Sequence, residues 1–435
     1  MKILYAAVAV AGALYFLLKK RRFDFLTIGY FSALIYFLPA FFGVVMSQYG
    51  PLDPVRPPML TETYLVMLTV IVAILIGAIL YDQIPHPVHR HVGLSGTASA
   101  GNWALLLSAI GGVMSVLTSG LDALLNIDKN VLMANINIWL FIWEMGGELA
   151  VVFFFCRRQW FRFGLALLIV FADVFIGFRV SFAFAFMACF TLWADAQGRQ
   201  RFGLRNIRPI LVATSAIAFL FLYKAVYVPV KAGMWWLVRD QLTSFEAYSE
   251  TIKISEPFVT QSILNQVLLS DFHVPFDHFR NVLYQFMFFA PSLGAKAMNF
   301  NDYFQPQLFP YIVDMGLANN IWAEMWSTGG WTLLLLFVVF DVVVLCYLSR
   351  LLRIDNLELR GALALPAVAW AFYLHRNDLF VETNIIKRRV VLGTICLVAA
   401  MLSHDATHRL RRGVRMGVKR VAQRRRERRQ QVLEQ

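Results

Sequence analysis

Runs of apolar residues long enough to cross a lipid bilayer recur along the whole chain, separated by short polar segments. A single helix of about 20 apolar residues spans the hydrocarbon core. We expect spans at 3–18, 25–46, 61–81, 103–117, 136–156, 163–178, 180–193, 209–227, 331–351, 363–374 and 390–402. Backbone polar groups in lipid must be satisfied internally, so these spans are helices. The sequence therefore predicts an all-α polytopic membrane protein with about eleven transmembrane helices.

The low charge content agrees with this class. Of the 435 residues, 59% are hydrophobic and 15% are charged, whereas a soluble domain carries about 25% charged residues. Most of the surface must therefore face lipid. The four cysteines show no Cys-x-x-Cys or Cys/His spacing, so neither a zinc site nor a disulfide framework is indicated. We expect no metal and no cofactor.

Lysine and arginine residues in the short loops predict the orientation. They cluster at 19–22, 157–162, 199–208, 350–360 and in the tail, and this side is the cytoplasm by the positive-inside rule. We therefore expect a periplasmic N-terminus and a cytoplasmic C-terminus. One cluster, Lys387-Arg388-Arg389, falls on the outer face in this scheme. Either the last two spans have other boundaries, or cations on that face have a use.

Four regions follow from this pattern: transmembrane helices at 1–227, a large outer loop at 228–330, further spans at 331–405 and a basic tail at 406–435. The loop shows helical spacing of apolar residues and dense aromatics, so we expect amphipathic helices that pack on or into the membrane. Between Arg409 and Arg429 the tail carries eleven Lys/Arg and one acid. We interpret it as a cytosolic segment that fixes topology or contacts lipid, with no nucleic acid as partner.

Three arginines occupy the predicted outer face, where the positive-inside bias disfavours cations. Arg179 lies between two apolar runs, Arg280 lies inside the outer loop and Arg376 follows the tenth span. For each one, the alternative is a side chain that snorkels at the lipid interface. Arginine binds phosphate or diphosphate through two parallel hydrogen bonds and stays charged. Together the three predict an anionic ligand at the edge of the membrane.

Candidate general bases lie close to these arginines in the sequence: His273, His278, His375 and Glu324. A base that works near neutral pH is a histidine or a carboxylate with a raised pKa. No spacing rule selects among them, and Glu324 has the alternative of an ordinary interfacial carboxylate. The chain has no Walker A loop, no GxSxG elbow and no HExxH motif. It also lacks an acidic pair for a metal-bound sugar nucleotide.

Three blocks resemble the Wzy family of O-antigen and repeat-unit polysaccharide polymerases, in particular the subgroup with the polymerase of enterobacterial common antigen. The first is the Gly-Phe-Arg tip at 177–179 before an apolar span. The second, at 280–330, has an arginine, an aromatic stretch ending in proline and a glycine-leading segment. The third is His-Arg-Asn-Asp-Leu at 375–379. The plan of many spans with one large outer loop also agrees, although the family's multi-arginine loop pattern is only partly present.

The resemblance implies a type C glycosyltransferase fold in the bacterial inner membrane. Such an enzyme moves a growing chain from undecaprenyl diphosphate to the non-reducing end of a new lipid-linked repeat unit at the periplasmic face. It releases undecaprenyl diphosphate and needs no metal, because arginines neutralise the leaving group. The implied partners are undecaprenyl-diphosphate-linked oligosaccharide, membrane lipids, a chain-length regulator and a flippase.

The same resemblance suggests roles for individual residues. The diphosphate would be bound by four side chains: Arg179, Arg280, Arg376 and His375. The acceptor hydroxyl would be deprotonated by His278 or Glu324, with His375 as a third choice. Arg280 and Arg376 would stabilise the charge that develops.

Aromatic residues of the second block are candidates to line a sugar or isoprenoid groove: Tyr284, Phe288 and Trp322. Core or interface packing is the alternative for each. Other functions remain open at this point. An O-antigen ligase shares the fold and the donor, and a lipid-linked oligosaccharide flippase is a transporter alternative that predicts repeat symmetry. A non-catalytic secretion factor and an acyltransferase are weaker alternatives.

Overall fold

The computed structural model describes the chain except residues 51–52, 54, 86–91, 93, 127–130, 132–134, 199–214, 216–222, 224–225, 245–254, 287–297, 313–316 and 434–435. Regular secondary structure within the described part is helical, as predicted. Six helices are long and apolar enough to span a membrane, and two shorter apolar helices accompany them. The chain is therefore a multi-pass membrane protein by helix length and hydropathy. The predicted span at 209–227 lies largely outside the described residues.

The six candidate spans are α4 (Thr61–Gln83), η1 with α5 (Thr97–Ser119), α8 (Ile138–Cys156), α10 (Arg179–Ala196), α17 (Ile321–Leu351) and α18 with the turns after it (Leu357–Arg376). The shorter apolar helices are α1 (Lys2–Leu18) and α2 (Phe25–Tyr36). Further helices are α3 (Pro39–Phe42), α6 (Leu121–Leu124), α9 (Trp160–Ile176), α12 (Trp235–Thr243), α14 (Glu256–Leu269), α15 (Phe276–Phe286), α16 (Asn301–Leu308) and α19 (Leu379–Leu433).

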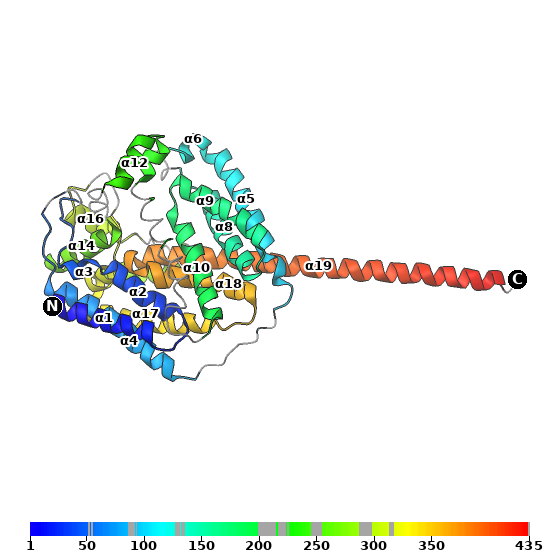
Figure 1. Ribbon diagram of the computed structural model, residues 1–435, viewed down its shortest axis with the longest axis horizontal. Helices are drawn as coiled ribbons and strands as arrows, with labels where there is room; N and C mark the ends of the chain where they lie inside the picture. The colour runs from blue at the N-terminus through cyan, green and yellow to red at the C-terminus, as the bar shows by residue number, and fades with distance from the viewer. Residues whose placement is uncertain are drawn as a thin grey trace.

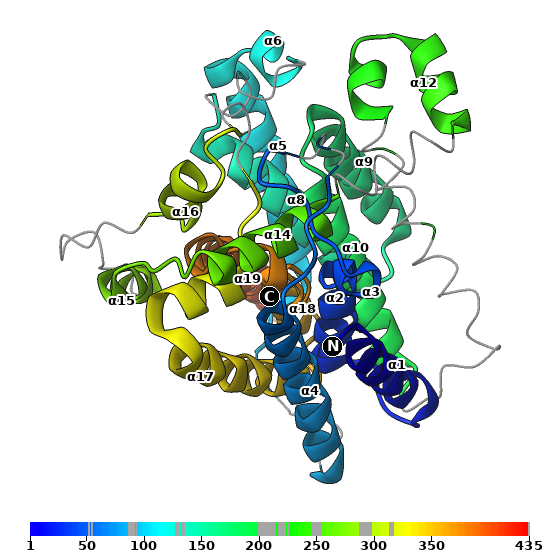
Figure 2. The ribbon, with the colours of Figure 1, turned by 90° about the vertical axis from the view of Figure 1, so that its left-hand side faces the viewer.

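The helix α19 organises the bundle. It runs through the other helices along the longest axis of the molecule and continues well beyond them, so the two termini lie at opposite ends (Figure 1). Along that axis, α17, α4 and α1 lie on one side and α5, α8 and α9 on the other, with α14 crossing the end that carries the N-terminus (Figure 2). Much of α14 is buried, so this helix of the predicted outer loop packs inside the protein.

Small residues allow α5 and α8 to approach closely. A Cβ atom added at Gly111 would lie 2.5 Å from the backbone nitrogen of Trp143, and one added at Gly146 would lie 2.9 Å from that of Ser108. The Ser108 hydroxyl donates a hydrogen bond to the Trp143 carbonyl at 2.6 Å. Close backbone approach of this kind is how helices associate where lipid removes the hydrophobic driving force.

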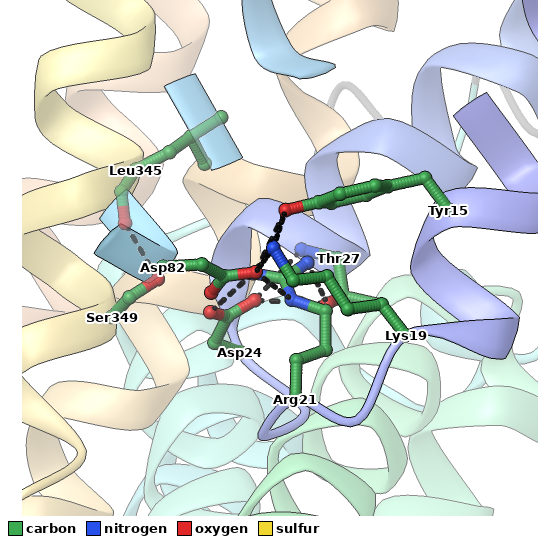
Figure 3. A network of polar contacts seen from close by, with 8 residues as sticks. All are labelled: Tyr15, Lys19, Arg21, Asp24, Thr27, Asp82, Leu345 and Ser349. Atoms are coloured by element: carbon green, nitrogen blue, oxygen red, sulfur yellow. Dashed lines mark hydrogen bonds and ion pairs between the residues drawn. The ribbon is translucent and has the colours of Figure 1, made fainter. Parts of the chain in front are cut away.

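An ion-pair network joins the C-terminal ends of α1 and α4 to the start of α2 (Figure 3). The Arg21 guanidinium lies 2.9 Å from Asp24 and 3.3 Å from Asp82. The Tyr15 hydroxyl donates to Asp82 at 2.9 Å, and Lys19 lies 3.6 Å from the same carboxylate. Arg21 and Asp24 are buried, so part of the basic segment 19–22 is an internal tie between helices.

Residues of three basic clusters predicted for one face, 19–22, 157–162 and 350–360, make contacts at the ends of helices, and the cluster at 199–208 lies outside the described residues. Arg22 lies 3.6 Å from Asp195 at the end of α10, and Arg157 pairs with Glu358 at the start of α18. The Arg353 guanidinium lies over an aromatic ring at the end of α4. These contacts agree with the grouping that the sequence predicts. The assignment of these clusters to the cytoplasm stays a prediction.

The basic cluster at 387–389 has a different place from the one predicted. Because α19 begins at Leu379, the cluster lies inside this helix and not in an outer loop. Arg389 is 2% exposed, and its guanidinium meets both carboxylate oxygens of Glu148 at 2.7 and 2.8 Å. The helix therefore begins before the predicted span at 390–402, and the cationic side chain of Arg389 is paired within the bundle.

A kink divides α17 at Gly329-Gly330. Gly330 has φ +58° and ψ −156°, a conformation that is essentially restricted to glycine. The segment before the kink carries Trp322 and Glu324 and is capped by the Asn320 side chain, which accepts the Trp322 N–H at 2.9 Å. The predicted start of a span at residue 331 coincides with this kink, whereas the helix itself begins at Ile321.

Candidate functional site

Several of the predicted site residues meet at the connection between α18 and α19, residues 374–379. This connection lies at the same end of the bundle as α14 and α15, which face the viewer in Figure 2. A 3-10 turn, η5 (Leu374–Arg376), is followed by Asn377 in an extended conformation and then by the start of α19. Its successive residues contact α17, α14 and α15, so segments far apart in sequence converge there.

His278 of α15 and Glu324 of α17 form a buried pair. The His278 Nε2 atom lies 2.7 Å from Glu324 Oε1, and the two residues are 3% and 0% exposed. The second carboxylate oxygen of Glu324 accepts the Leu379 N–H at 2.7 Å. A carboxylate only accepts, so Nε2 is the nitrogen that donates in this pair, and in the neutral imidazole Nδ1 then keeps a lone pair. That buried Nδ1 atom has no hydrogen-bond partner among the described residues.

Asp378 adds a second buried carboxylate beside this pair. Its two oxygens accept the backbone N–H groups of Phe300 and Val381, each at 2.7 Å. Burial, and then the nearby Glu324 carboxylate, raise the pKa of Asp378 from 3.8 to about 7. The carboxyl group of Asp378 therefore holds a proton more readily than an exposed aspartate does. Asp378 was part of the sequence block, but its contacts depend on residues 78 positions away.

The other two histidine candidates are placed differently. Both ring nitrogens of His375 are engaged: Nδ1 accepts from Trp322 Nε1 at 3.2 Å, and Nε2 lies 3.3 Å from the Gly29 carbonyl. His375 and Trp322 are 1% and 0% exposed. His273 is exposed and stacks on Trp326, with ring centroids 5.4 Å apart. Of the three histidines, His278 is the one that combines burial, a carboxylate partner and a ring nitrogen without a partner.

Arg376 forms an ion pair with a carboxylate from α14, and Arg179 lies in the same neighbourhood. Arg376 Nε lies 3.0 Å from Glu256 Oε2 at the start of α14, and its guanidinium lies over the Tyr373 ring. Arg179, the first residue of α10, lies within electrostatic range of both Glu256 and Arg376. In the described part of the chain Arg179 makes no hydrogen bond or ion pair. A partly buried guanidinium with unused donors is suited to an anionic ligand.

Arg280 does not join these two arginines. It is exposed on α15 and forms an ion pair with Asp277 at 3.1 Å, and both side chains are more than half exposed. Residues two positions apart in a helix are separated by about 200° around its axis. Arg280 therefore lies on nearly the opposite face of α15 from His278. Tyr284 of the same helix is half-buried. Phe288 lies outside the described residues.

Sequence reasoning did not single out Glu256. The one signal available was its place after Ser255 and before Pro257, which is typical of the start of a helix. The ion pair between Glu256 and Arg376 connects residues 120 positions apart in the sequence. A local sequence pattern cannot predict such a contact. The buried pair of Glu148 and Arg389 was likewise not predicted as a pair.

Comparisons of the chain with protein-family models, with curated proteins and with solved structures each find no match. Within the described residues, no group of three or more His, Cys, Asp or Glu side chains is arranged to hold a metal ion.

Proposed function

We propose that this protein is a glycosyltransferase that polymerises undecaprenyl-diphosphate-linked oligosaccharide repeat units at the periplasmic face of the bacterial inner membrane. The observation that carries the proposal is the buried pair of His278 and Glu324, which leaves His278 Nδ1 as a proton acceptor. Glu324 also accepts the N–H of Leu379, which follows Arg376 by three residues in the chain. Arg376 in turn forms the ion pair with Glu256. Transfer from a lipid diphosphate needs this combination of a base and a cationic anion site.

In the proposed reaction, a hydroxyl of the acceptor repeat unit attacks the anomeric carbon of the growing chain. The new glycosidic C–O bond forms while the bond from that carbon to the diphosphate oxygen breaks. His278 Nδ1 takes the hydroxyl proton, and Glu324 stabilises the imidazolium, as a carboxylate does in other oriented histidine pairs. Undecaprenyl diphosphate leaves with one more negative charge, which Arg179 and Arg376 neutralise.

The proposal uses Arg179 and Arg376 for the diphosphate and leaves Arg280 outside that site, because Arg280 faces away from His278 and pairs with Asp277. Since His278 Nδ1 is buried, the acceptor reaches it only when α15 shifts relative to α17. The end of the bundle that holds the site is opposite to the basic tail (Figure 1). A periplasmic site and a cytoplasmic tail are consistent with that separation.

The test is polymerisation in vitro, with the purified protein in detergent and undecaprenyl-diphosphate repeat units as both donor and acceptor. Wild type is compared with His278→Gln and with Glu62→Gln, a change in an exposed acid of the first turn of α4. We expect ladders of longer oligomers without nucleotide sugar from wild type and Glu62→Gln, and none from His278→Gln. Transfer only to lipid A core would indicate a ligase. Movement of intact substrate across liposomes would indicate a flippase, and no reaction would reject the proposal.

A further inference from the structure

The ion pair of Arg376 and Glu256 places a negative group where the proposed function needs a diphosphate. Arg376 Nε and Glu256 Oε2 are 3.0 Å apart, and the two side chains are 24% and 35% exposed. Part of each side chain is therefore accessible, although the Arg376 Nε atom itself is buried, whereas the pair of His278 and Glu324 is fully buried. Partly exposed ion pairs of this kind are weak, because solvent screens them. A stronger anion can displace the carboxylate.

Glu256 serves two guanidinium groups. Arg179 lies near enough to interact electrostatically with both Glu256 and Arg376. A carboxylate between two guanidinium groups offsets the repulsion between them. The terminal nitrogens of Arg376 make no hydrogen bond within the described residues. Arg179 has all of its donors unused there. One carboxylate thus neutralises two arginines only in part, and the three side chains keep a net charge of +1.

We propose that Glu256 is a resident anion that the diphosphate of the lipid-linked substrate displaces from Arg376 and Arg179. This inference rests on the proposed function. Glu256 then competes with the ligand and lowers the affinity of the two arginines for diphosphate. Its return to Arg376 after the transfer favours release of undecaprenyl diphosphate, the product that carries the greater negative charge.

The position of Glu256 explains why the carboxylate stays available for this exchange. It is in the first turn of α14, where the partial positive charge of a helix N-terminus stabilises a carboxylate. Much of α14 is buried against the bundle, and its Asn265 side chain accepts the Thr63 hydroxyl at 2.9 Å. The packing of α14 therefore holds its backbone in place. When the ligand enters, only the Glu256 side chain at the start of the helix needs to move.

The experiment measures binding of inorganic pyrophosphate to the full-length protein in detergent by calorimetry. We compare wild type with Glu256→Gln, with the shorter acid Glu256→Asp, and with Glu62→Gln as the control acid. We expect roughly five- to twenty-fold tighter binding to Glu256→Gln, because a competing and repelling charge is removed. Glu256→Asp should fall between the two, and Glu62→Gln should match wild type. In turnover assays, undecaprenyl diphosphate should inhibit Glu256→Gln at lower concentrations than wild type.

Arg376→Ala separates failure of this inference from failure of the proposed function. Loss of pyrophosphate binding in Arg376→Ala, with equal or weaker binding to Glu256→Gln, would overturn the role of Glu256 and keep the arginine site. Equal binding to wild type and Arg376→Ala, or none to either, would overturn both. If binding changes as expected but no polymer forms from any lipid-linked sugar, the displacement of Glu256 by diphosphate is supported and the proposed polymerase activity is rejected. Size-exclusion elution and the thermal midpoint report whether each variant is folded.

Discussion

Glu324 Oε1 and His278 Nε2 lie 2.7 Å apart across 46 residues of sequence, and the other oxygen of Glu324 accepts the N–H of Leu379. One carboxylate thereby links α15, α17 and the start of α19. Since a carboxylate oxygen accepts, Nε2 is the nitrogen of the His278 ring that donates to Glu324. The hydrogen-bonding arrangement, more than the presence of a histidine in the outer loop, is what makes His278 a candidate base.

Glu324→Gln should abolish most polymerisation while the fold is kept. The amide oxygen can still accept the Leu379 N–H, but the amide nitrogen then donates to His278 Nε2 and moves the ring proton to Nδ1. The base is lost, and general-base catalysis contributes on the order of 100-fold or more. Initial rates of ladder formation and thermal midpoints measure the effect, with Glu62→Gln as the control. A rate within threefold of wild type, on the order of an ordinary surface effect, would exclude this role.

Replacing the arginines one by one by lysine should divide them into two groups. Lysine keeps the charge but loses the planar fork, and a charge-assisted hydrogen bond contributes about 1.5–3 kcal/mol. We therefore expect roughly 10- to 100-fold lower rates for Arg179→Lys and Arg376→Lys. Arg280→Lys should stay close to wild type, because Arg280 is exposed and paired with Asp277. If Arg280→Lys lost as much activity as Arg376→Lys, the diphosphate site would have to include α15.

The buried pair of Glu148 and Arg389 should be costly to break from one side only. Arg389→Met leaves an uncompensated carboxylate in the core, and such changes destabilise by about 3–5 kcal/mol. The double variant Glu148→Leu with Arg389→Met should recover a large part of that loss, because both buried charges are then gone. Unfolding in mixed micelles measures the free energy of each variant. Strict additivity of the two single changes would argue that the side chains do not interact.

The stability of the protein should depend on the charge of Asp378. Its pKa is raised from 3.8 to about 7 in the folded state, so the folded state binds the proton more tightly than the unfolded state. The contribution of Asp378 to the free energy of unfolding is therefore fully present below about pH 4. It is lost as the pH rises through about 7. Between these values the thermal midpoint of wild type should fall relative to that of Asp378→Asn. A constant difference from pH 4 to 8 would show that Asp378 does not titrate in this range.

Gly330→Ala should destabilise the kinked helix α17. A Cβ at this position meets nothing within 4 Å, so the cost comes from the backbone conformation alone, about 1–3 kcal/mol. Gly164→Ala is the matched control, because Gly164 is helical in α9 and also faces open space. There, alanine should be neutral or stabilise by up to about 1 kcal/mol. Equal effects at the two glycines would mean that the kink is not a fixed feature.

The membrane class and most helix positions were predictable, because both depend on local composition. The apolar run at 61–81 became α4 (Thr61–Gln83), and the run at 136–156 became α8 (Ile138–Cys156). Errors occurred where a helix contains charge. The start of α19 was missed because Lys387, Arg388 and Arg389 look like loop residues, and only the partner Glu148 makes one of them compatible with the bundle.

The candidate site was predicted in part. His278, Glu324, Arg179 and Arg376 were all named from the sequence, yet nothing in their spacing said which would meet. By itself, the sequence determined the helical membrane architecture and the residue types available at one end, since hydropathy and charge act locally. Only the tertiary structure decided that Glu324 orients His278, that Glu256 joins Arg376, and that Arg280 points away. Those contacts depend on how α14, α15 and α17 pack against the start of α19, which is a property of distant segments together.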